Sequence, residues 1–483
     1  MSTAGNREKI QKAGSFHIEK LEIITSKGVV VNLLGALVHI TFFEDIQSSS
    51  ITGNCIINDL LNLSTIGPVI GQEYLRMKIN TQGLSEDEGT FDFTDNLLVV
   101  NSLTSKTEGA SGNEFLTIEF STSELQKDQR IRINQSYSGS YSDIFKKIMR
   151  DHLSSKKKLY VEPSRGTKKL IFPNFSPFEA INMMKRQAVS AHDGSPTYMF
   201  FEDFKGYHFR SLSSMYSEPT VFTYKTSVPG SKPNDPVSDL STVIEFQIQS
   251  IGDTAAAQRL GAYASELISY DTYTRRHITT TYNYLDNFDS ETHVTAGKDT
   301  NIDEFPLISS TPVQGTSRMS DFPARRYLAP NANYIDDDGN YTNLTVLHDE
   351  EGKPVYNAIQ SETWLQKRES QLLQLDRGIT CSIKTNGNTL IDCGDVVEFN
   401  LPSVSAAKTE ENDTFDFFYR GRFLIRRIRH DFSLAARKHE SIMTLVKDSL
   451  SKELLSSDES LELEPEDNDE IVDEFYNSNV DKD

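Results

Sequence analysis

The chain has 483 residues, of which 37% are hydrophobic and 25% are charged, and its formal net charge at pH 7 is −21. This length predicts about three domains, and no apolar run approaches the ~18 residues of a membrane span, so we expect no stable membrane insertion. The polar stretch 1–11 lacks the apolar core of a signal peptide. Cys55, Cys381 and Cys393 imply no disulfide framework, which suits a reducing cytoplasm.

The first third of the chain is predicted to be strand-rich. Residues 1–15 have the composition of a flexible arm, and residues 16–135 alternate short apolar runs with clusters of Gly, Ser and Asn. Such spacing is typical of an antiparallel sandwich or barrel. We therefore expect a first β-barrel over residues 16–135.

The next segment, 136–225, mixes helix and strand signals. Apolar residues recur at helical spacing from Ser142 to Leu153. Ser176 followed by Pro177 and Glu179 predicts a capping box with proline at the first helical position. The run from Tyr198 to Phe209 predicts a hairpin, and the Pro/Gly-rich stretch 226–236 has the composition of a linker.

The part before the last strands is predicted to combine helices with a long insertion. Residues 237–290 should hold a helix from Thr254 to Ser269 and strands that join a second barrel, and the polar stretch 291–356 should be a loop-rich insertion. Ala358, Leu365 and Leu372 stand seven apart, as on one helix face. Asn357 with Gln360 could cap the start of that helix, and Gly378 would close it.

Residues Gly378 to Asp448 have the pattern of a compact β-unit. Ile379, Cys381 and Ile383 alternate with polar residues, and Asn386-Gly387 is the dipeptide best suited to a two-residue hairpin turn. Gly394-Asp395 predicts a second tight turn before the strand that begins at Val396. Cys381 and Cys393 could face each other, although two buried thiols fit better than a bridge.

Much of this pattern occurs twice. The turn and strand at Gly71 are similar to those at Gly394, and later strands match in the same order. The step from Gly71 to Leu103 is 32 residues, and the step from Gly394 to Ile428 is 34. Self-similarity in order and spacing favours one β-barrel used twice, over residues 16–135 and 357–450. Chance similarity between short apolar strands is the alternative.

Three segments resemble a known family. They run from Gly261 to Tyr284, from Arg368 through Leu375 to Val397, and from Gly421 through Phe432 to the closing strand. In these segments the chain resembles the central baseplate hub subunit of contractile-tailed phages, in its T-even-type form. Together they cover about a third of the chain, and none holds a catalytic motif.

The resemblance implies a structural virion protein of the tail baseplate, assembled in the host bacterial cytoplasm. It implies a homotrimer whose two tube-type barrels per chain form a pseudo-six-fold ring, adapting the six-fold tail tube to the three-fold cell-puncturing spike. The implied partners are the spike protein, the tail tube or a tube-initiator protein, the tape-measure protein and the surrounding wedge proteins. DNA would pass through the channel without specific binding, and an acidic chain would help because like charges repel.

Motifs for chemistry are few. Asp336-Asp337-Asp338-Gly339 hints at a calcium loop, but an EF-hand register puts Tyr334 and Thr345 where acidic ligands belong, so a β-turn fits better. The ten His residues lack paired metal spacing, and zinc, phosphate-loop and nucleophile-elbow motifs are missing. Paired carboxylates for wall cleavage could come from any of 70 acids. We therefore predict no catalytic, cofactor-binding or metal-binding residues, no cofactor and no enzyme activity.

Charge is unevenly distributed at the C-terminal end. Basic residues alternate with aromatic and aliphatic ones between Tyr419 and Lys438, a pattern found in nucleic-acid-binding strands. In so acidic a chain, a solvated strand face or a surface that pairs with acids of another subunit fits better. Residues 451–483 hold 13 Asp or Glu and 2 Lys, which favours a disordered acidic tail that solubilises the chain or docks on a basic partner. Deleting this tail should leave the barrels folded.

The predicted fold class is α+β and mainly β, with two related antiparallel tube-type β-barrels, a mixed α/β middle domain and inserted loops. The alternatives to a hub are the hub part of a contractile secretion-system spike, a tail-associated cell-wall hydrolase and a receptor-binding adhesin.

Overall fold

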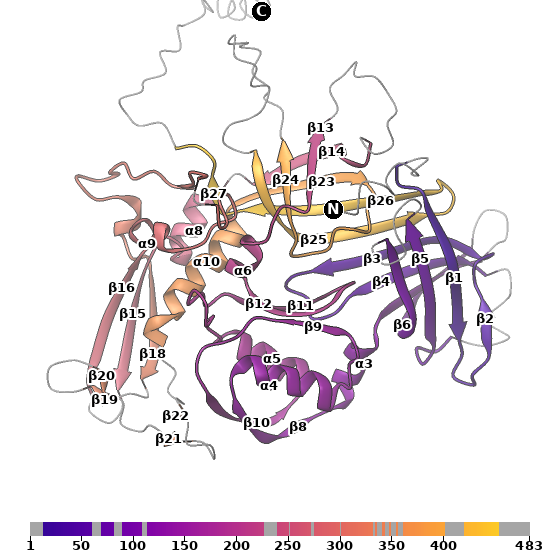
Figure 1. Cartoon of the computed structure of the whole chain (residues 1–483), viewed down its shortest axis with the longest axis horizontal. Helices are drawn as coiled ribbons and strands as arrows, with labels where there is room; N and C mark the ends of the chain where they lie inside the picture. Colours follow the sequence, from indigo (N-terminus) through magenta and orange to yellow (C-terminus); the bar gives the residue numbers. More distant parts are fainter. Residues whose placement is uncertain are drawn as a thin grey trace, which may run out of the picture.

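A computed structural model describes the chain at residues 13–59, 69–81, 89–108, 114–226, 239–250, 252–271, 275–299, 301–331, 334–335, 341–342, 347–348, 354–355, 361–400 and 420–453. The predicted arm 1–15 is described only from residue 13, and the predicted linker 226–236 and tail 451–483 lie almost wholly outside the described residues. Strands dominate, and thirteen of them form one continuous sheet (Figure 1). No helix in the described ranges is both long and apolar enough to cross a membrane.

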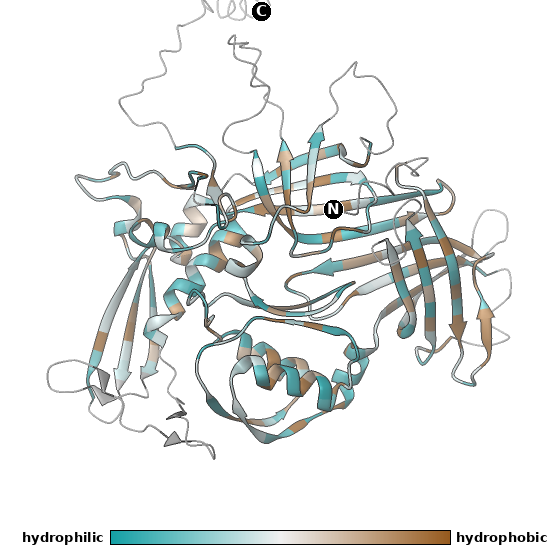
Figure 2. Cartoon of the chain, in the orientation of Figure 1, coloured by the Kyte–Doolittle hydropathy of each residue, from teal (hydrophilic) through white to brown (hydrophobic). Residues whose placement is uncertain are grey.

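The first seven strands form what we call the first unit. They are β1 (Phe16–Ile24), β2 (Val30–Asn32), β3 (Leu37–Asp45), β4 (Thr52–Asn58), β5 (Tyr74–Thr81), β6 (Thr90–Glu108) and β7 (Glu114–Thr122). Their order is β2-β1-β5-β6-β7-β4-β3, and every neighbouring pair is antiparallel. Hydrophobic and hydrophilic residues alternate along these strands (Figure 2), and the buried hydrophobic ones enclose an apolar core.

Six later strands form the second unit, a closed barrel. They are β13 (Phe222–Thr226), β14 (Thr242–Ser250), β23 (Ile379–Asn386), β24 (Val396–Asn400), β25 (Gly421–Ser433) and β26 (Lys438–Lys447). The ring order is β13-β24-β25-β26-β23-β14, and β14 returns to β13. Contrary to the prediction of an antiparallel barrel, β13 is parallel to both β24 and β14. β13 lies inside the predicted mixed segment 136–225, yet it pairs within this barrel.

Five strands have the same arrangement in both units. The neighbours β5-β6-β7-β4-β3 in the first unit correspond to β24-β25-β26-β23-β14 in the second, and each set also follows the same chain order. The glycines that led to the predicted repeat have nearly equal left-handed φ angles, +87° at Gly71 and +86° at Gly394. A side chain at either position would be strained.

The first unit, unlike the second, does not close on itself. No strand pairing joins β1 to β3 among the described residues. Instead β3 pairs with the second half of β25, from Arg427 to Ser433, while the first half of β25, from Gly421 to Leu424, pairs with β24. A bulge between Ile425 and Arg427 separates the two halves, and β26 follows both. The β25–β26 hairpin is therefore shared by the two units.

Between the units lies a mixed region, residues 123–216. Its elements are α3 (Ser123–Arg130), β8 (Ile133–Gly139), α4 (Tyr141–Lys147), the π-helix η1 (Ile148–His152), β9 (Lys158–Val161), β10 (Lys168–Phe175), α5 (Pro177–Lys185), β11 (Tyr198–Asp203), β12 (Gly206–Ser211) and α6 (Leu212–Tyr216). The predicted capping box at Ser176 and Glu179 is confirmed, as is the hairpin, in which Tyr198 pairs with Ser211. The predicted helix from Ser142 to Leu153 is present as α4 and η1.

The remaining elements form a smaller lobe, drawn at the left of Figure 1. They are α8 (Thr254–Leu260), β15 (Ala264–Asp271), β16 (His277–Asn283), α9 (Tyr284–Asn287), η2 (Phe288–Ser290), β17 (Phe305–Pro306), η3 (Met319–Asp321), β18 (Arg325–Asn331), β19 (Tyr334–Ile335), β20 (Tyr341–Thr342), β21 (Leu347–His348), β22 (Pro354–Val355), η4 (Ser361–Thr363), α10 (Leu365–Arg377) and β27 (Ser449–Leu450). β15 lies between β16 and β18 in a three-stranded sheet, so the stretch predicted as a loop-rich insertion supplies one of its strands.

The structure contradicts two local predictions. The helix predicted from Thr254 to Ser269 ends at Leu260, because Gly261 adopts a φ of +89° and a strand begins at Ala264. Asn386-Gly387 forms no hairpin, since β23 and β24 are not neighbours. Gly387 instead lies against the His439 ring, where a Cβ would come within 2.0 Å of it.

The closing of α10 at Gly378 is confirmed, whereas the predicted cap at Asn357 and Gln360 lies outside the described residues. The three cysteines are free and buried, as predicted.

Candidate functional site at the junction of the two units

The junction between the units is the most unusual part of the structure, because one hairpin completes two cores. Phe432 on β25 is fully buried in the core of the first unit, and its ring lies 5.2 Å from that of Phe16. The backbone N–H of His439 on β26 donates to the carbonyl of Gly14, just before β1. The far end of the shared hairpin thus bridges most of the gap between β3 and β1.

The cations of the predicted basic segment pair with groups of the same chain. Arg427 bonds to Asp45 across the β3–β25 pairing, and Arg426 lies 2.8 Å from Asp376. Arg422 donates to the carbonyl oxygens of Tyr216, Glu218 and Ala296. Shorter-range pairs join Arg429 to Asp431 and Lys438 to Glu440. Within the chain, Arg422, Arg426 and Arg427 therefore link β25 to other elements at the junction.

Behind these surface pairs is a buried polar group. Glu44 of β3 is fully buried, its Oε2 accepts from the backbone N–H of Cys393 at 3.2 Å, and its Oε1 lies 3.6 Å from Nε2 of His430. His430 Nδ1 is 3.1 Å from Nε2 of His439. Burial raises the pKa of Glu44 well above its ordinary 4.5 and lowers the pKa of His430 to about 3. Burial therefore disfavours the charged form of both Glu44 and His430.

The tip of the β11–β12 hairpin inserts beside this group. The Phe204 ring stacks on Phe91 of the first unit at 3.6 Å, and Lys205 Nζ lies 2.7 Å from Asp392 of the second unit. Asp392 is buried beside Asp203, and burial followed by the charge of Asp203 raises the pKa of Asp392 to about 8. One turn of the mixed region therefore contacts both units and places its cation among their acids.

A second buried network attaches the mixed region to the first unit. Lys157 lies between Glu124 and Glu202, 3.0 Å from the former and in direct contact with the latter. Glu202 Oε2 also accepts from the Thr122 hydroxyl at 2.6 Å and from the Ile51 N–H at 3.0 Å. Oε2 of Glu202 therefore joins the mixed region to the first unit, and Lys157 links Glu202 to Glu124.

The smaller lobe is attached through His293. Its Nδ1 lies 2.9 Å from Asp448 at the end of β26, and the N–H of Val294 donates to the same carboxylate at 3.0 Å. Burial alone would lower the pKa of His293, but the Asp448 carboxylate outweighs it and raises that pKa to about 9. This ion pair holds the lobe against the second unit.

The His293 pair predicts a specific loss of stability at alkaline pH. Because the folded-state pKa is raised above the ordinary 6.5, its contribution is complete below about pH 6.5 and lost as pH rises through about 9. We expect His293→Gln to remove this part of the pH dependence of the melting temperature, with the exposed His192→Gln as control. A variant whose profile still falls like that of the wild type between pH 6.5 and 9 would assign the effect to other groups.

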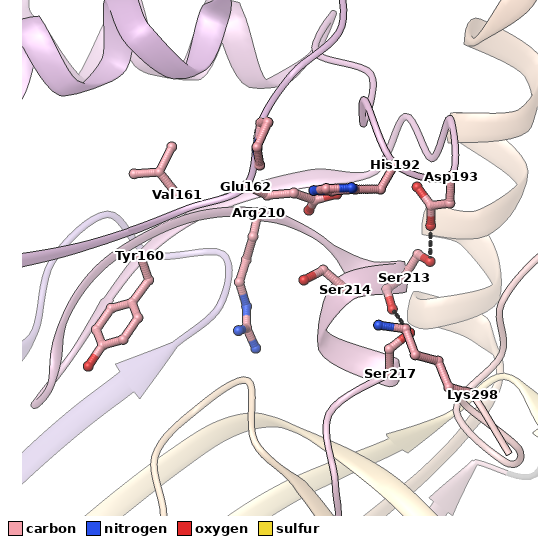
Figure 3. Close-up of a pocket in the computed structure, with 11 residues that line it drawn as sticks. Tyr160, Val161, Glu162, His192, Asp193, Arg210, Ser213, Ser214, Ser217 and Lys298 are labelled. Atoms are coloured by element: carbon pink, nitrogen blue, oxygen red, sulfur yellow. Dashed lines mark hydrogen bonds between the residues drawn. The ribbon is translucent and has the colours of Figure 1, made fainter.

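One cavity brings a serine, a histidine and an aspartate together without forming a triad. It measures about 510 Å³ and lies between the mixed region and Lys298 of the smaller lobe (Figure 3). Ser213 donates directly to Asp193, and among the described residues the His192 ring bonds to neither. A base between the nucleophile and the orienting acid is what nucleophilic catalysis requires. This geometry does not provide it.

The sequence named no site residues, and the junction explains why none could be found. Glu44 precedes Asp392 by 348 residues and His430 by 386, and the three share no spacing motif. Within the described ranges no group of three or more His, Cys, Asp or Glu residues could hold a metal ion. The acidic turn at 336–339 lies outside those ranges.

No protein-family model matches the chain, and no curated protein matches it. Among solved structures, the chain is similar to the tail protein from Neisseria meningitidis MC58, with 11% identity over 90% of this chain and 97% of that chain and a TM-score of 0.48. It is also similar to the 43 kDa tail protein of prophage MuSo2 from Shewanella oneidensis, with 10% identity over 89% and 98% of the two chains and a TM-score of 0.48. A chain of the phage P2 baseplate in its activated conformation matches at 9% identity over 89% and 98%, with a TM-score of 0.30.

Proposed function

We propose that this protein is a structural baseplate hub subunit of a contractile tail, assembled in the host cytoplasm and acting as a homotrimeric ring in the virion. The resemblance of the Gly261, Arg368 and Gly421 segments to the hub family supports this role. The observation that carries it is the β3–β25 pairing, which joins two units of like strand order side by side within one chain. Each chain would contribute two barrel units, so three chains would give six.

The same pairing can be repeated between chains. β3 corresponds to β14, and β25 corresponds to β6, by their places in the shared neighbour order. If the second unit contacts the first unit of the next chain in the way that the first unit contacts the second within one chain, β14 will pair antiparallel with the second half of β6. This contact is head-to-tail, and a head-to-tail contact closes into a ring when its rotation permits.

Both strands have the edge that this pairing needs. On the side away from β7, β5 pairs with β6 only as far as Val99, and no described strand follows. On the side away from β23, β13 pairs with β14 only as far as Val243, and again no described strand follows. Leu103 on β6 and Ile244 and Phe246 on β14 are exposed by 37%, 47% and 39%. Long apolar edges of this kind are normally covered in native proteins.

A ring of six similar units has a mechanical use. It matches a six-fold tail tube on one side, and its three-fold chain symmetry matches a trimeric spike on the other. An open centre would let DNA pass, and the net charge of −21 would discourage adhesion to the lumen. Tube, tape-measure and wedge proteins are the remaining partners that the hub role implies.

The test places a lysine on each of the two strand edges, at positions that belong to neither hydrophobic core. We expect Leu103→Lys with Ile244→Lys to convert a trimer of 54.5 kDa chains into monomers in sedimentation at micromolar concentration, because an edge lysine opposes strand addition. The monomeric variant should still unfold cooperatively, at a lower temperature than the trimer because it lacks the stabilisation of the subunit contact. Ile171→Lys, at a position exposed by 73% in the mixed region, is the matched control and should remain trimeric.

A trimer that survives both edge lysines would refute this interface. A wild-type protein that stays monomeric both alone and when mixed with its spike and tube partners would refute the ring itself.

A further inference from the structure

The mixed region is strongly basic in an otherwise acidic chain. Residues 127–186 hold 14 Lys or Arg against 5 Asp or Glu, a net charge of +9, so the remaining residues carry −30. Of these cations, only Lys157 belongs to the buried network that attaches the mixed region to the first unit. So sharp a segregation of charge creates a local positive field that opposes the field of the rest of the chain.

The densest part of this surface is built by one side chain. Arg150 on η1 donates to the backbone carbonyl of Ser155 and, at 3.0 Å, to that of Lys157. These bonds hold the loop before β9 against the helical turn that carries Lys147 and Arg150, and Lys156 and Lys158 flank the bonded Lys157 on that loop. We call these four exposed residues the basic ridge.

The ridge is not neutralised by the described part of the chain. No carboxylate there forms a salt bridge with Lys147, Arg150, Lys156 or Lys158, although Asp151 is a neighbour in sequence. Lys158 instead lies over the Tyr160 ring, 4.5 Å from its centre. Four exposed cations on one loop and the helical turn bonded to it form a surface suited to a partner of several negative charges.

We propose that the basic ridge binds the acidic C-terminal segment 454–483, of its own chain or of a neighbouring copy. That segment carries 12 Asp or Glu and a single lysine, with apolar residues such as Leu461 and Phe475 between the acids. Its 30 residues can span about 100 Å when extended, so reach does not restrict it. This inference does not depend on the ring.

Charge and connectivity favour this occupant over nucleic acid. A long polyanion approaching from solution meets a chain of net charge −21. The C-terminal segment is already attached, so its effective concentration at the ridge is in the millimolar range. It also carries the opposite charge at high density.

The experiment is zero-length carbodiimide cross-linking of the full chain at low salt, read by mass spectrometry. We expect links from acids in 454–483 to Lys147, Lys156 and Lys158, and their loss at high salt, since exposed ion pairs are screened. The variant Lys147→Glu, Lys156→Glu and Lys158→Glu leaves Arg150 and its loop contacts intact. In it, remaining lysines of the mixed region, such as Lys146 and Lys169, should lose most of their links to the segment.

The matched control reverses the charge of three cations outside the mixed region. Lys27→Glu, Arg259→Glu and Lys298→Glu alter exposed cations outside the mixed region and should keep the ridge links. Links that are absent from wild type, or that fall equally in both triple variants, would overturn the proposal. A further outcome would also overturn the proposal: the protein shows no links between ridge and segment, and it retains a labelled single-stranded oligonucleotide only while the ridge lysines are present. That result would assign the ridge to nucleic acid.

Discussion

Replacing Lys157 with methionine is expected to lower the free energy of unfolding by about 3–5 kcal/mol, the usual cost of removing one partner of a buried ion pair. The substitution leaves Glu124 and Glu202 facing each other, with side chains that are 3% and 1% exposed. Burial raises the pKa of Glu202 even with the lysine present. Without the cation, both carboxyls must take up protons or stay charged away from water.

Urea unfolding at pH 7 measures this loss, and Lys147→Met is the control because that side chain is exposed. Adding Glu124→Gln and Glu202→Gln to Lys157→Met should recover much of the stability, since neutral amides need no cation. A single mutant within about 0.5 kcal/mol of wild type, the range of ordinary surface substitutions, would show that the network contributes little to docking.

Glu44→Gln is expected to stabilise the protein, increasingly so as pH rises. The pKa of Glu44 is raised in the folded state, so folding takes up a proton at any pH between the ordinary 4.5 and the folded value. The cost of that uptake is absent below about pH 4.5 and grows by about 1.4 kcal/mol per pH unit above it. Glutamine has no proton to take up, and its amide can donate to His430 Nε2, which lies 3.6 Å from Oε1 in the wild type.

The informative quantity is the difference between variant and wild type in denaturant unfolding at pH 5, 6, 7 and 8. Asp392, with its pKa of about 8, makes both proteins lose stability over this range, so the difference reports Glu44 together with its electrostatic interaction with Asp392. Glu19→Gln on β1, next to Lys78, controls for a carboxylate at the surface. A difference that is flat with pH would mean that Glu44 is ionised in the folded protein.

Local features of the fold could be predicted from sequence because their causes are local. The alternation of Ile379, Cys381 and Ile383 marks a strand whichever strands become its neighbours. The Ser176 capping box is complete within four residues. Strand pairing is not determined locally. Asn386-Gly387 is a dipeptide that favours a hairpin turn, but β23 pairs with β14 and β26 instead of the strand that follows it, so tertiary pairing overrides the local turn preference.

The junction could not be predicted for the same reason. The alternation in β25 shows which face is buried, but it does not show that Phe432 enters one core while Leu424 enters another. Phe204 and Lys205 read as an ordinary hairpin turn, and only the assembled fold shows that they contact two units. Residues whose role depends on three segments meeting carry no local signal.

The shared hairpin also has a consequence for biosynthesis. Strand β7 of the first unit ends at Thr122, whereas Phe432, which completes its core, is synthesised 310 residues later. At bacterial translation rates of about 5–20 residues per second, that interval is about 15–60 s. Throughout it the nascent N-terminal half has an open β3 edge and a core without Phe432, so it is exposed to aggregation until the last strands emerge.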